Sequence, residues 1–196
     1  MLTVILTGGA SRRMGRDKAM LPYQGATMLQ RLIERYAALG PVAVSVDRAG
    51  RFPCAGAAEL PDAFPGQGPL NGIVSGFRAT QADALLLTAV DLPHGSVALA
   101  RRLAELRGDA DVCLLRRGVK GIEPLFAIYG RACLPVAEDC LQQGRKAIFA
   151  LLDRVRVRYV APEELAEFDL ERCFLNVNTP EDYAGLQPCG EIKTPD

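Results

Sequence analysis

The chain has 196 residues, of which 49% are apolar and 23% are charged, and its formal net charge is zero. This length suits one α/β domain with a substantial core, whereas a neutral chain is not expected to bind nucleic acid through bulk electrostatics. The apolar run at the N-terminus spans only residues 2–6, which is too short for a signal peptide or a membrane-spanning helix. We therefore expect a cytoplasmic protein that binds neither nucleic acid nor membranes, with one domain over residues 1–187 and a loosely ordered tail over residues 188–196.

Apolar runs and helical periodicities alternate along the chain. Strands are predicted over residues 2–6, 42–46, 83–90, 111–115, 125–129 and 155–159. Helices are predicted over residues 27–38, 96–107, 130–142 and 146–152. This alternation predicts an α/β protein with a mostly parallel sheet and helices on both faces. The alternation of valine and arginine in residues 155–159 indicates an edge strand, and residues 47–69, rich in proline and glycine, are interpreted as a functional loop.

The first strand runs straight into a basic, glycine-rich segment, residues 7–18. Glycines let backbone N–H groups approach phosphate oxygens, and arginine and lysine side chains bind phosphate. The Walker A spacing is absent because Gly15 is followed by Arg16, and the dinucleotide-binding spacing is absent because Gly8 and Gly9 are adjacent. The segment is therefore interpreted as a polyphosphate loop of another kind. The alternative is an ordinary turn with solvated arginines.

Asp91 directly follows the apolar strand predicted over residues 83–90. Ligands of open parallel sheets bind outside the carboxyl ends of the strands, so we expect Asp91 to face the basic loop. Asp91 is the candidate metal ligand, because Mg²⁺ takes one or two carboxylates and completes its shell with water and phosphates. The alternative is that Asp91 caps a helix that begins near Gly95. A second polar segment, residues 61–72, is expected to reach the same edge of the sheet.

Two amide side chains, Asn176 and Asn178, stand at alternate positions before a predicted helix start. Thr179, which is followed by Pro180 and acidic residues, has a structural explanation as the cap of that helix. The asparagines have no such explanation, and they share a face that can hydrogen-bond a ligand. The only histidine is His94, which we expect at the surface, and the six cysteines match no zinc spacing and suit a reducing compartment. We therefore expect chemistry without a protein nucleophile.

Together these segments resemble the molybdenum cofactor guanylyltransferases. The resemblance rests on Leu6-Thr7-Gly8-Gly9, Arg12-Arg13-Met14-Gly15, Lys18, Gly68-Pro69-Leu70-Asn71-Gly72, Val90-Asp91-Leu92-Pro93, Glu123-Pro124-Leu125-Phe126 and Asn176-Val177-Asn178-Thr179-Pro180. The opening motif alone marks only the wider nucleotidyltransferase superfamily, whereas the motifs around Gly68 and Asn176 are more specific. Gly9 fits the guanine-using branch, since the cytidine-using sibling typically has alanine there. Thr7 and Asp47 stand where the family more often has alanine and asparagine.

The resemblance implies a three-layer, Rossmann-like nucleotidyltransferase fold. It also implies transfer of GMP from GTP to the terminal phosphate of molybdopterin, with Mg²⁺ as cofactor and pyrophosphate as the second product. The implied catalytic residues are Lys18, Arg13 and Asp91, and Asp91 is the implied metal ligand. The implied nucleotide-binding residues are Leu6, Thr7, Gly8, Gly9, Gly15, Lys18, Asp62, Gly68, Pro69, Leu70 and Asp91, and the implied pterin-side residues are Asn176 and Asn178.

Other functions remain open at this point. The chain could be a cytidylyltransferase that acts on the same pterin, another nucleotidyltransferase of sugars or small molecules, or a GTP-binding accessory protein without turnover. The resemblance also implies transient contact with other proteins that make or insert the molybdenum cofactor. A preference for GTP or CTP would discriminate between the first two enzymes, and the absence of any dinucleotide product would favour the accessory protein.

Overall fold

An eight-stranded sheet forms the middle of the computed structural model, which describes residues 1–8, 17–52, 56–64, 66–118 and 121–186. Seven strands form a continuous path in the order β10-β7-β9-β6-β1-β4-β5, and β8 pairs with β7 outside it. Their bounds are β1 (Leu2–Leu6), β4 (Val42–Val46), β5 (Ala58–Pro61), β6 (Ala84–Ala89), β7 (Val112–Arg117), β8 (Gly121–Ile122), β9 (Phe126–Gly130) and β10 (Val157–Val160). Neighbours along the path are parallel except that β9 runs antiparallel to β6 and β7. The predicted mostly parallel sheet and the edge position of β10 are thus confirmed.

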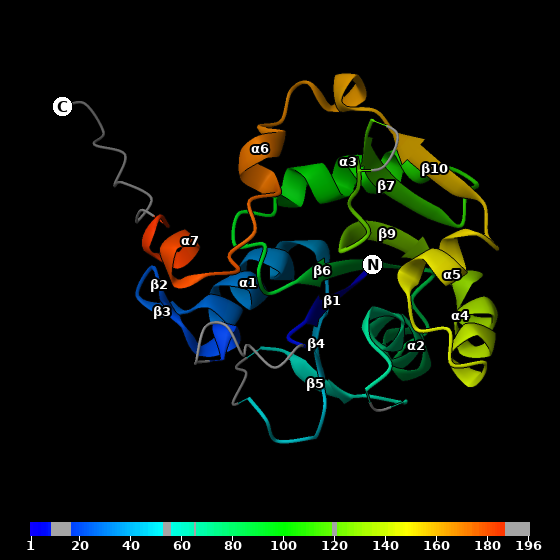
Figure 1. Ribbon diagram of the computed structural model, residues 1–196, viewed down its shortest axis with the longest axis horizontal. Coiled ribbons are helices and arrows are strands. Elements are labelled where there is room, and N and C mark those ends of the chain that lie inside the picture. Colours follow the sequence, from blue (N-terminus) through cyan, green and yellow to red (C-terminus); the bar gives the residue numbers. More distant parts are fainter. Residues whose placement is uncertain (9–16, 53–55, 65, 119–120, 187–196) are drawn as a thin grey trace.

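Helices cover both faces of the sheet, which gives the three layers that the sequence predicts (Figure 1). The α-helices are α1 (Met28–Tyr36), α2 (Pro69–Ala79), α3 (Val97–Arg107), α4 (Cys133–Gln142), α5 (Ile148–Leu152), α6 (Leu170–Cys173) and α7 (Pro180–Ala184). Short 3-10 helices lie at η1 (Lys18–Met20), η2 (Ala37–Leu39) and η3 (Pro162–Leu165), and β2 (Pro22–Tyr23) pairs with β3 (Ala26–Thr27) in a separate hairpin. No helix of the described residues is long and apolar enough to cross a membrane.

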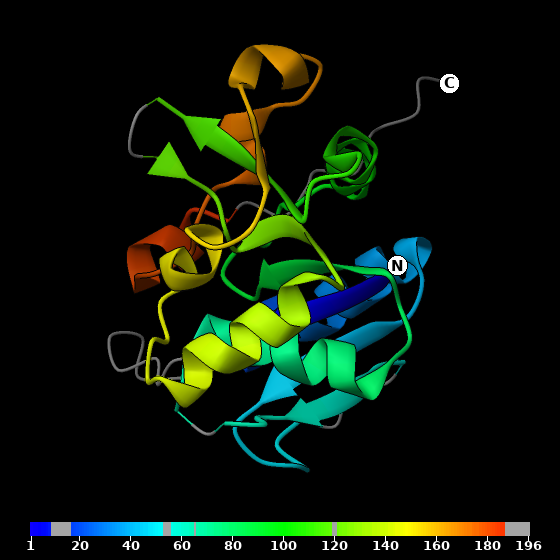
Figure 2. The same cartoon turned by 90° about the vertical axis from the view of Figure 1, so that its right-hand side faces the viewer.

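The buried residues form two clusters, one on each side of the sheet. One cluster joins α1 and α3 to one face, and the other joins α2, α4 and α5 to the opposite face. Adjacent strand residues divide between them, because successive side chains of a strand point to opposite faces: Ile5 of β1 belongs to the first cluster and Val4 to the second. Figure 2 shows α2 and α4 side by side across the second face.

Helix α2 corrects the sequence prediction, which gives an irregular loop over residues 47–69 and no helix over residues 70–79. Its glycines lower helix propensity, but they let the helix approach β1 closely. A Cβ atom on Gly72 would lie 2.4 Å from Cδ2 of Leu6, and one on Gly76 would lie 2.8 Å from Cγ2 of Val4. Tertiary packing therefore decides the conformation of this segment. The predicted helices over 130–142 and 146–152 also begin later, at Cys133 and Ile148.

Four cysteines of the described residues lie in the core. Cys113, Cys133, Cys140 and Cys173 are buried and unpaired in disulfides. Cys54, Cys189 and the predicted tail over 188–196 lie outside the described residues.

The turn between β6 and α3 closes tightly onto the core at Gly95. A Cβ atom there would lie 2.2 Å from the hydroxyl of Tyr36 and 2.8 Å from Cε2 of Phe126, and both rings are fully buried. We expect Gly95→Ala to lower the free energy of unfolding by about 1–3 kcal/mol, because buried rings cannot move aside cheaply. Urea unfolding measures this change. Gly185→Ala is the control, since its Cβ would meet nothing closer than 3.4 Å; equal stability of the two variants would contradict the prediction.

Candidate active site

The candidate site lies at the carboxyl edge of the sheet, around the end of β1. β1 pairs in parallel with β4 on one side and with β6 on the other, so these three strands end at one edge. β5 is parallel to β4 and ends there too. The order of the strands across the sheet therefore reverses at β1, because β4 and β5 lie on one side of β1 and β6 lies on the other. Such a switch point is where open α/β sheets bind ligands.

Asp91 follows β6 at this edge and carries a buried carboxylate oxygen without a partner. Within the described residues, no hydrogen-bond donor reaches its Oδ1 atom. Burial raises the pKa of Asp91, while the positive charge of Lys18 opposes that rise. Helix α3 is capped instead by Ser96, whose side chain accepts a hydrogen bond of 3.3 Å from Leu99 N. The capping explanation of Asp91 is therefore wrong, and an unpartnered buried carboxylate oxygen fits a cation.

Lys18 lies near Asp91 in the structure, although the two residues are far apart in the sequence. Its Nζ atom donates a hydrogen bond of 2.8 Å to Oδ1 of Asn178, a residue 160 positions away. Lys18 opens η1, which is capped by the Asp17 side chain accepting from Ala19 N at 3.1 Å. The structure thus brings together Lys18, Asp91 and Asn178, which belong to three separate motifs of the sequence.

The segment that carries the two asparagines is fixed to the turn after β6. Val177 is fully buried, and its N–H donates a hydrogen bond of 2.9 Å to the carbonyl oxygen of Asp91. Asn176 and Asn178 flank it and are exposed. Asn176 also donates from Nδ2 to the carbonyl oxygen of Phe174 at 3.3 Å. Thr179 caps α7 as expected, accepting from Asp182 N at 3.1 Å.

The predicted nucleotide-binding residues divide into packed and accessible groups. Thr7 is buried and its hydroxyl donates to the carbonyl oxygen of Ser45 at 2.7 Å, so that hydroxyl is used by the fold. Leu70 is fully buried, so only its backbone is free to meet a ligand. Leu6 is half-buried, and Gly8 is exposed at the end of β1. Gly9, Arg13 and Gly15 lie outside the described residues.

Asp62 and the start of α2 lie next to each other at the end of β5. The Ser45 hydroxyl donates to Oδ1 of Asp62 at 3.4 Å, and burial raises the pKa of this carboxyl. Gly68 caps α2 with φ +72°, a conformation that favours glycine, and Pro69 occupies its first turn. The fully buried Asn71 fixes the preceding loop by accepting from Phe64 N at 2.9 Å and donating to Phe64 O at 3.1 Å.

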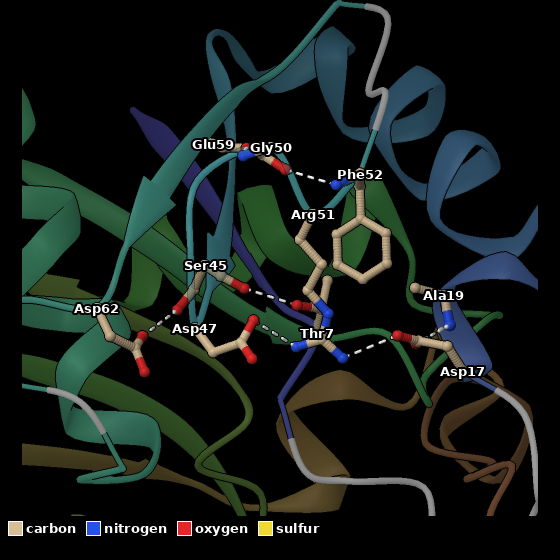
Figure 3. Close-up of polar contacts among 10 residues, drawn as sticks. All are labelled: Thr7, Asp17, Ala19, Ser45, Asp47, Gly50, Arg51, Phe52, Glu59 and Asp62. Carbon is tan, nitrogen blue, oxygen red and sulfur yellow. Dashed lines mark hydrogen bonds and ion pairs between the residues drawn. The ribbon is translucent and has the colours of Figure 1, made fainter.

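Sequence reasoning missed Arg51, which joins the loop after β4 to the base of the glycine-rich segment (Figure 3). Its guanidinium lies 2.8 Å from Oδ2 of Asp17 and 2.9 Å from Oδ1 of Asp47. Glu59 holds the same loop by accepting from Phe52 N at 2.6 Å. No local pattern could have found Arg51, because its partner Asp17 is 34 positions away.

His94 is half-buried rather than simply at the surface. Its ring meets Tyr23 edge-on, with 6.4 Å between the ring centroids. Burial lowers the pKa of His94, and the charges of Arg172 and Arg35 lower it further. Among the described residues, no three His, Cys, Asp or Glu side chains form a group that could hold a metal by themselves. A metal at Asp91 would therefore rely on ligands from water and substrate.

Comparison with known proteins identifies the family. The family model described as "MobA-like NTP transferase domain" matches residues 3–158. A "Probable molybdenum cofactor guanylyltransferase" of Carboxydothermus hydrogenoformans is 36% identical over 194 residues, which cover 98% of each chain. The chain belongs to the molybdenum cofactor guanylyltransferase family. The predicted family, and with it the assignment as a nucleotidyltransferase, is thereby confirmed.

Solved structures show the fold of this guanylyltransferase family member. The molybdopterin-guanine dinucleotide biosynthesis protein A of Archaeoglobus fulgidus has a TM-score of 0.81 and 24% identity, covering 94% of this chain and 96% of its own. The Rv0371C protein of Mycobacterium tuberculosis, solved as a complex with manganese, has a TM-score of 0.60 and 18% identity, covering 94% and 96%. Both likenesses support the predicted three-layer nucleotidyltransferase fold.

Proposed function

We propose that this protein transfers GMP from GTP to the terminal phosphate of the molybdopterin cofactor. An oxygen of that phosphate forms a bond to the α-phosphorus of GTP, the bond from the α-phosphorus to the bridging oxygen breaks, and pyrophosphate leaves. The convergence of Lys18, Asp91 and Asn178 at the carboxyl edge carries this proposal, because it unites a cation, a metal-ligating carboxylate and an amide at one place. Family membership supports the choice of both substrates.

The chemistry requires that charge be neutralised and that two anions be held in line. Two phosphate charges about 4 Å apart repel each other by about 4 kcal/mol at an effective dielectric constant near 20. The Lys18 ammonium supplies one positive charge beside Asn178. Mg²⁺ held by Asp91 would supply further charge neutralisation on the triphosphate. The orphaned Oδ1 atom of Asp91 supports this assignment, as does the manganese complex of a protein with the same fold.

The remaining residues divide between the two substrates. We propose that Gly8, Asp62 and the start of α2 at Gly68 and Pro69 bind the nucleotide, since all four follow strands or open a helix at the carboxyl edge. We assign the pterin side to Asn176 and Asn178, which are both exposed, and Asn178 accepts a hydrogen bond from Lys18. Arg13 keeps its predicted catalytic role, and Gly9 and Gly15 keep their predicted roles in binding the nucleotide. A cytoplasmic location stays a prediction, and buried free thiols are typical of such a reducing compartment. Transient contacts with other proteins of cofactor assembly also stay a prediction.

Binding of the nucleotide is tested by thermal stability. With Mg²⁺ present, GTP at a hundredfold excess over its Kd is expected to stabilise the protein by about 2.7 kcal/mol, because a ligand that binds only the native state stabilises it by mass action. Differential scanning fluorimetry with GTP, CTP and ATP, each with Mg²⁺ and with EDTA, measures the effect. Stabilisation by CTP at lower concentrations than GTP would contradict the proposed specificity.

Turnover is tested by incubating the protein with molybdopterin, Mg²⁺ and either GTP or CTP. The expected result is release of pyrophosphate and formation of the guanine dinucleotide with GTP alone. A cytosine dinucleotide would show a cytidylyltransferase instead. Tight binding of GTP without any dinucleotide would show an accessory protein.

A further inference from the structure

Arg117, the last residue of β7, makes a concentrated set of contacts that the proposed catalytic roles leave unexplained. Its guanidinium lies 2.5 Å from Oε1 of Glu171 and donates to the carbonyl oxygen of Leu170 at 2.9 Å. Its Nε atom lies 3.8 Å from Oε1 of Glu123. Its Cζ atom lies 5.2 Å from the centre of the Phe174 ring. One side chain thus joins the end of β7 to α6 and to the residue that follows α6.

Phe174 connects this cluster to the asparagine segment. Its ring is buried and meets Phe126 of β9 edge-on at 5.6 Å between centroids. Its carbonyl oxygen accepts the hydrogen bond from Nδ2 of Asn176. Three residues beyond Phe174, the main chain is fixed to the Asp91 carbonyl by Val177 N. A shift of Phe174 would therefore move Asn176 while the other end of the segment stays fixed.

Glu123 faces Arg117 across a longer ion pair, in which the buried Nε atom of Arg117 has no hydrogen-bond partner among the described residues. It belongs to the glutamate-proline segment that marks the family resemblance, yet it lies in the turn before β9 and outside the group formed by Lys18, Asp91 and Asn178. The side chains of Arg117 and Glu123 are 28% and 29% exposed. Burial raises the pKa of Glu123, and the charge of Arg117 opposes that rise. An ion pair that is this exposed adds little to the stability of the fold.

We propose that Arg117, fixed by Glu171 and the Leu170 carbonyl, is a positioning residue for the acceptor substrate, acting through Phe174 on Asn176 and Asn178. This inference rests on the proposed function, in which the two asparagines face the pterin. Arg117 would not touch either substrate. A guanidinium suits this role because its planar fork can donate hydrogen bonds to the Leu170 carbonyl and the Glu171 carboxylate at once. Its flat face also lies over the Phe174 ring.

The test separates the two substrates kinetically. Arg117→Ala is expected to raise the KM for molybdopterin about tenfold or more while the KM for GTP changes less than about twofold, since misplacing a substrate-binding group by about 1 Å can cost about a hundredfold. Arg117→Lys keeps the charge but loses the fork, so it should fall between wild type and Arg117→Ala. The matched control is Arg116→Ala, which removes the neighbouring guanidinium, stacked 4.8 Å from the Tyr159 ring, and should leave both KM values unchanged.

A double-mutant cycle tests whether Arg117 acts through the asparagine. If it does, Arg117→Ala adds little to the loss already caused by Asn176→Ala, because the two effects are coupled. Additive losses, or equal rises of both KM values, would overturn the proposal. A lower melting temperature with unchanged KM values would also overturn it, since that is the signature of a purely structural ion pair.

Two further outcomes keep the test decisive. If Arg117→Ala does not fold, Arg117→Lys decides, and an unchanged KM for molybdopterin in that variant overturns the proposal. If the wild-type protein makes no dinucleotide from GTP, the proposed function itself fails. If the wild type is active and the Arg117 variants behave like it, only the positioning role fails.

Discussion

Asp91→Asn is expected to lower kcat for guanylyl transfer by about 10³-fold while the fold stays intact. The change keeps the size of the side chain but removes the charge that would hold the metal, and metal charge stabilisation contributes several kcal/mol to such reactions. Initial rates of pyrophosphate release at saturating GTP and Mg²⁺ measure the loss. Circular dichroism checks the fold. Turnover near the wild-type rate would remove Asp91 from the catalytic machinery.

The same variant should be more stable than the wild type at neutral pH in the absence of metal and nucleotide. Burial raises the pKa of Asp91 above its value in the unfolded chain. Stability from the protonated form is therefore fully present below the unfolded pKa and is lost as the pH rises through the folded pKa. Asparagine mimics the protonated form and escapes this loss. The difference in melting temperature should vanish at acid pH and appear as the pH approaches neutrality.

Asp111→Asn is the matched control for both measurements. Asp111 lies just before β7, at the opposite edge of the sheet, and its hydrogen bonds with Arg156 lower its pKa. A lowered pKa contributes stability above the unfolded pKa, which is lost as the pH falls through the folded pKa. This variant should therefore be less stable than the wild type at neutral pH, with unchanged turnover. The two Asp→Asn changes thus have opposite expected signs in stability.

Lys18→Ala is expected to lower kcat/KM by about 10²-fold, because it removes a preorganised positive charge beside the reacting phosphates. Its effect on stability should be small, since the hydrogen bond from Lys18 to Asn178 is exposed. Lys18→Arg should recover only part of the activity, because a planar guanidinium cannot reproduce the compact ammonium. Rates at varied GTP and molybdopterin concentrations measure the loss.

Arg102→Ala provides the comparison for Lys18→Ala. It removes a surface cation of α3 that pairs with Glu105 at 3.3 Å, outside the candidate site. Its turnover should equal that of the wild type. An equal loss in both variants would mean that general surface charge, and not the position of Lys18, sets the rate.

Local patterns predicted most of the elements because those elements carry their own signals. The apolar runs over residues 2–6 and 83–90 are buried strands, and the helical spacing of residues 96–107 matches α3 closely. Helix α2 could not be predicted from the sequence, because Gly72 and Gly76 lower helix propensity. Their role is to let the helix pack closely against β1, which only the tertiary structure shows. The antiparallel direction of β9 could not be predicted either, since a strand has the same apolar pattern in either direction.

The sequence by itself identified the candidate residues for the chemistry. Asp91 after an apolar strand, Lys18 at the end of a glycine-rich segment and two alternating asparagines all stand out from local spacing. Only the tertiary structure decided that Lys18, Asp91 and Asn178 lie together, that Arg51 pairs with the distant Asp17, and that Arg117 contacts the distant Phe174. The physical reason is that strand order and register follow from burying both faces of the sheet. Those long-range contacts carry no periodic signal along the chain.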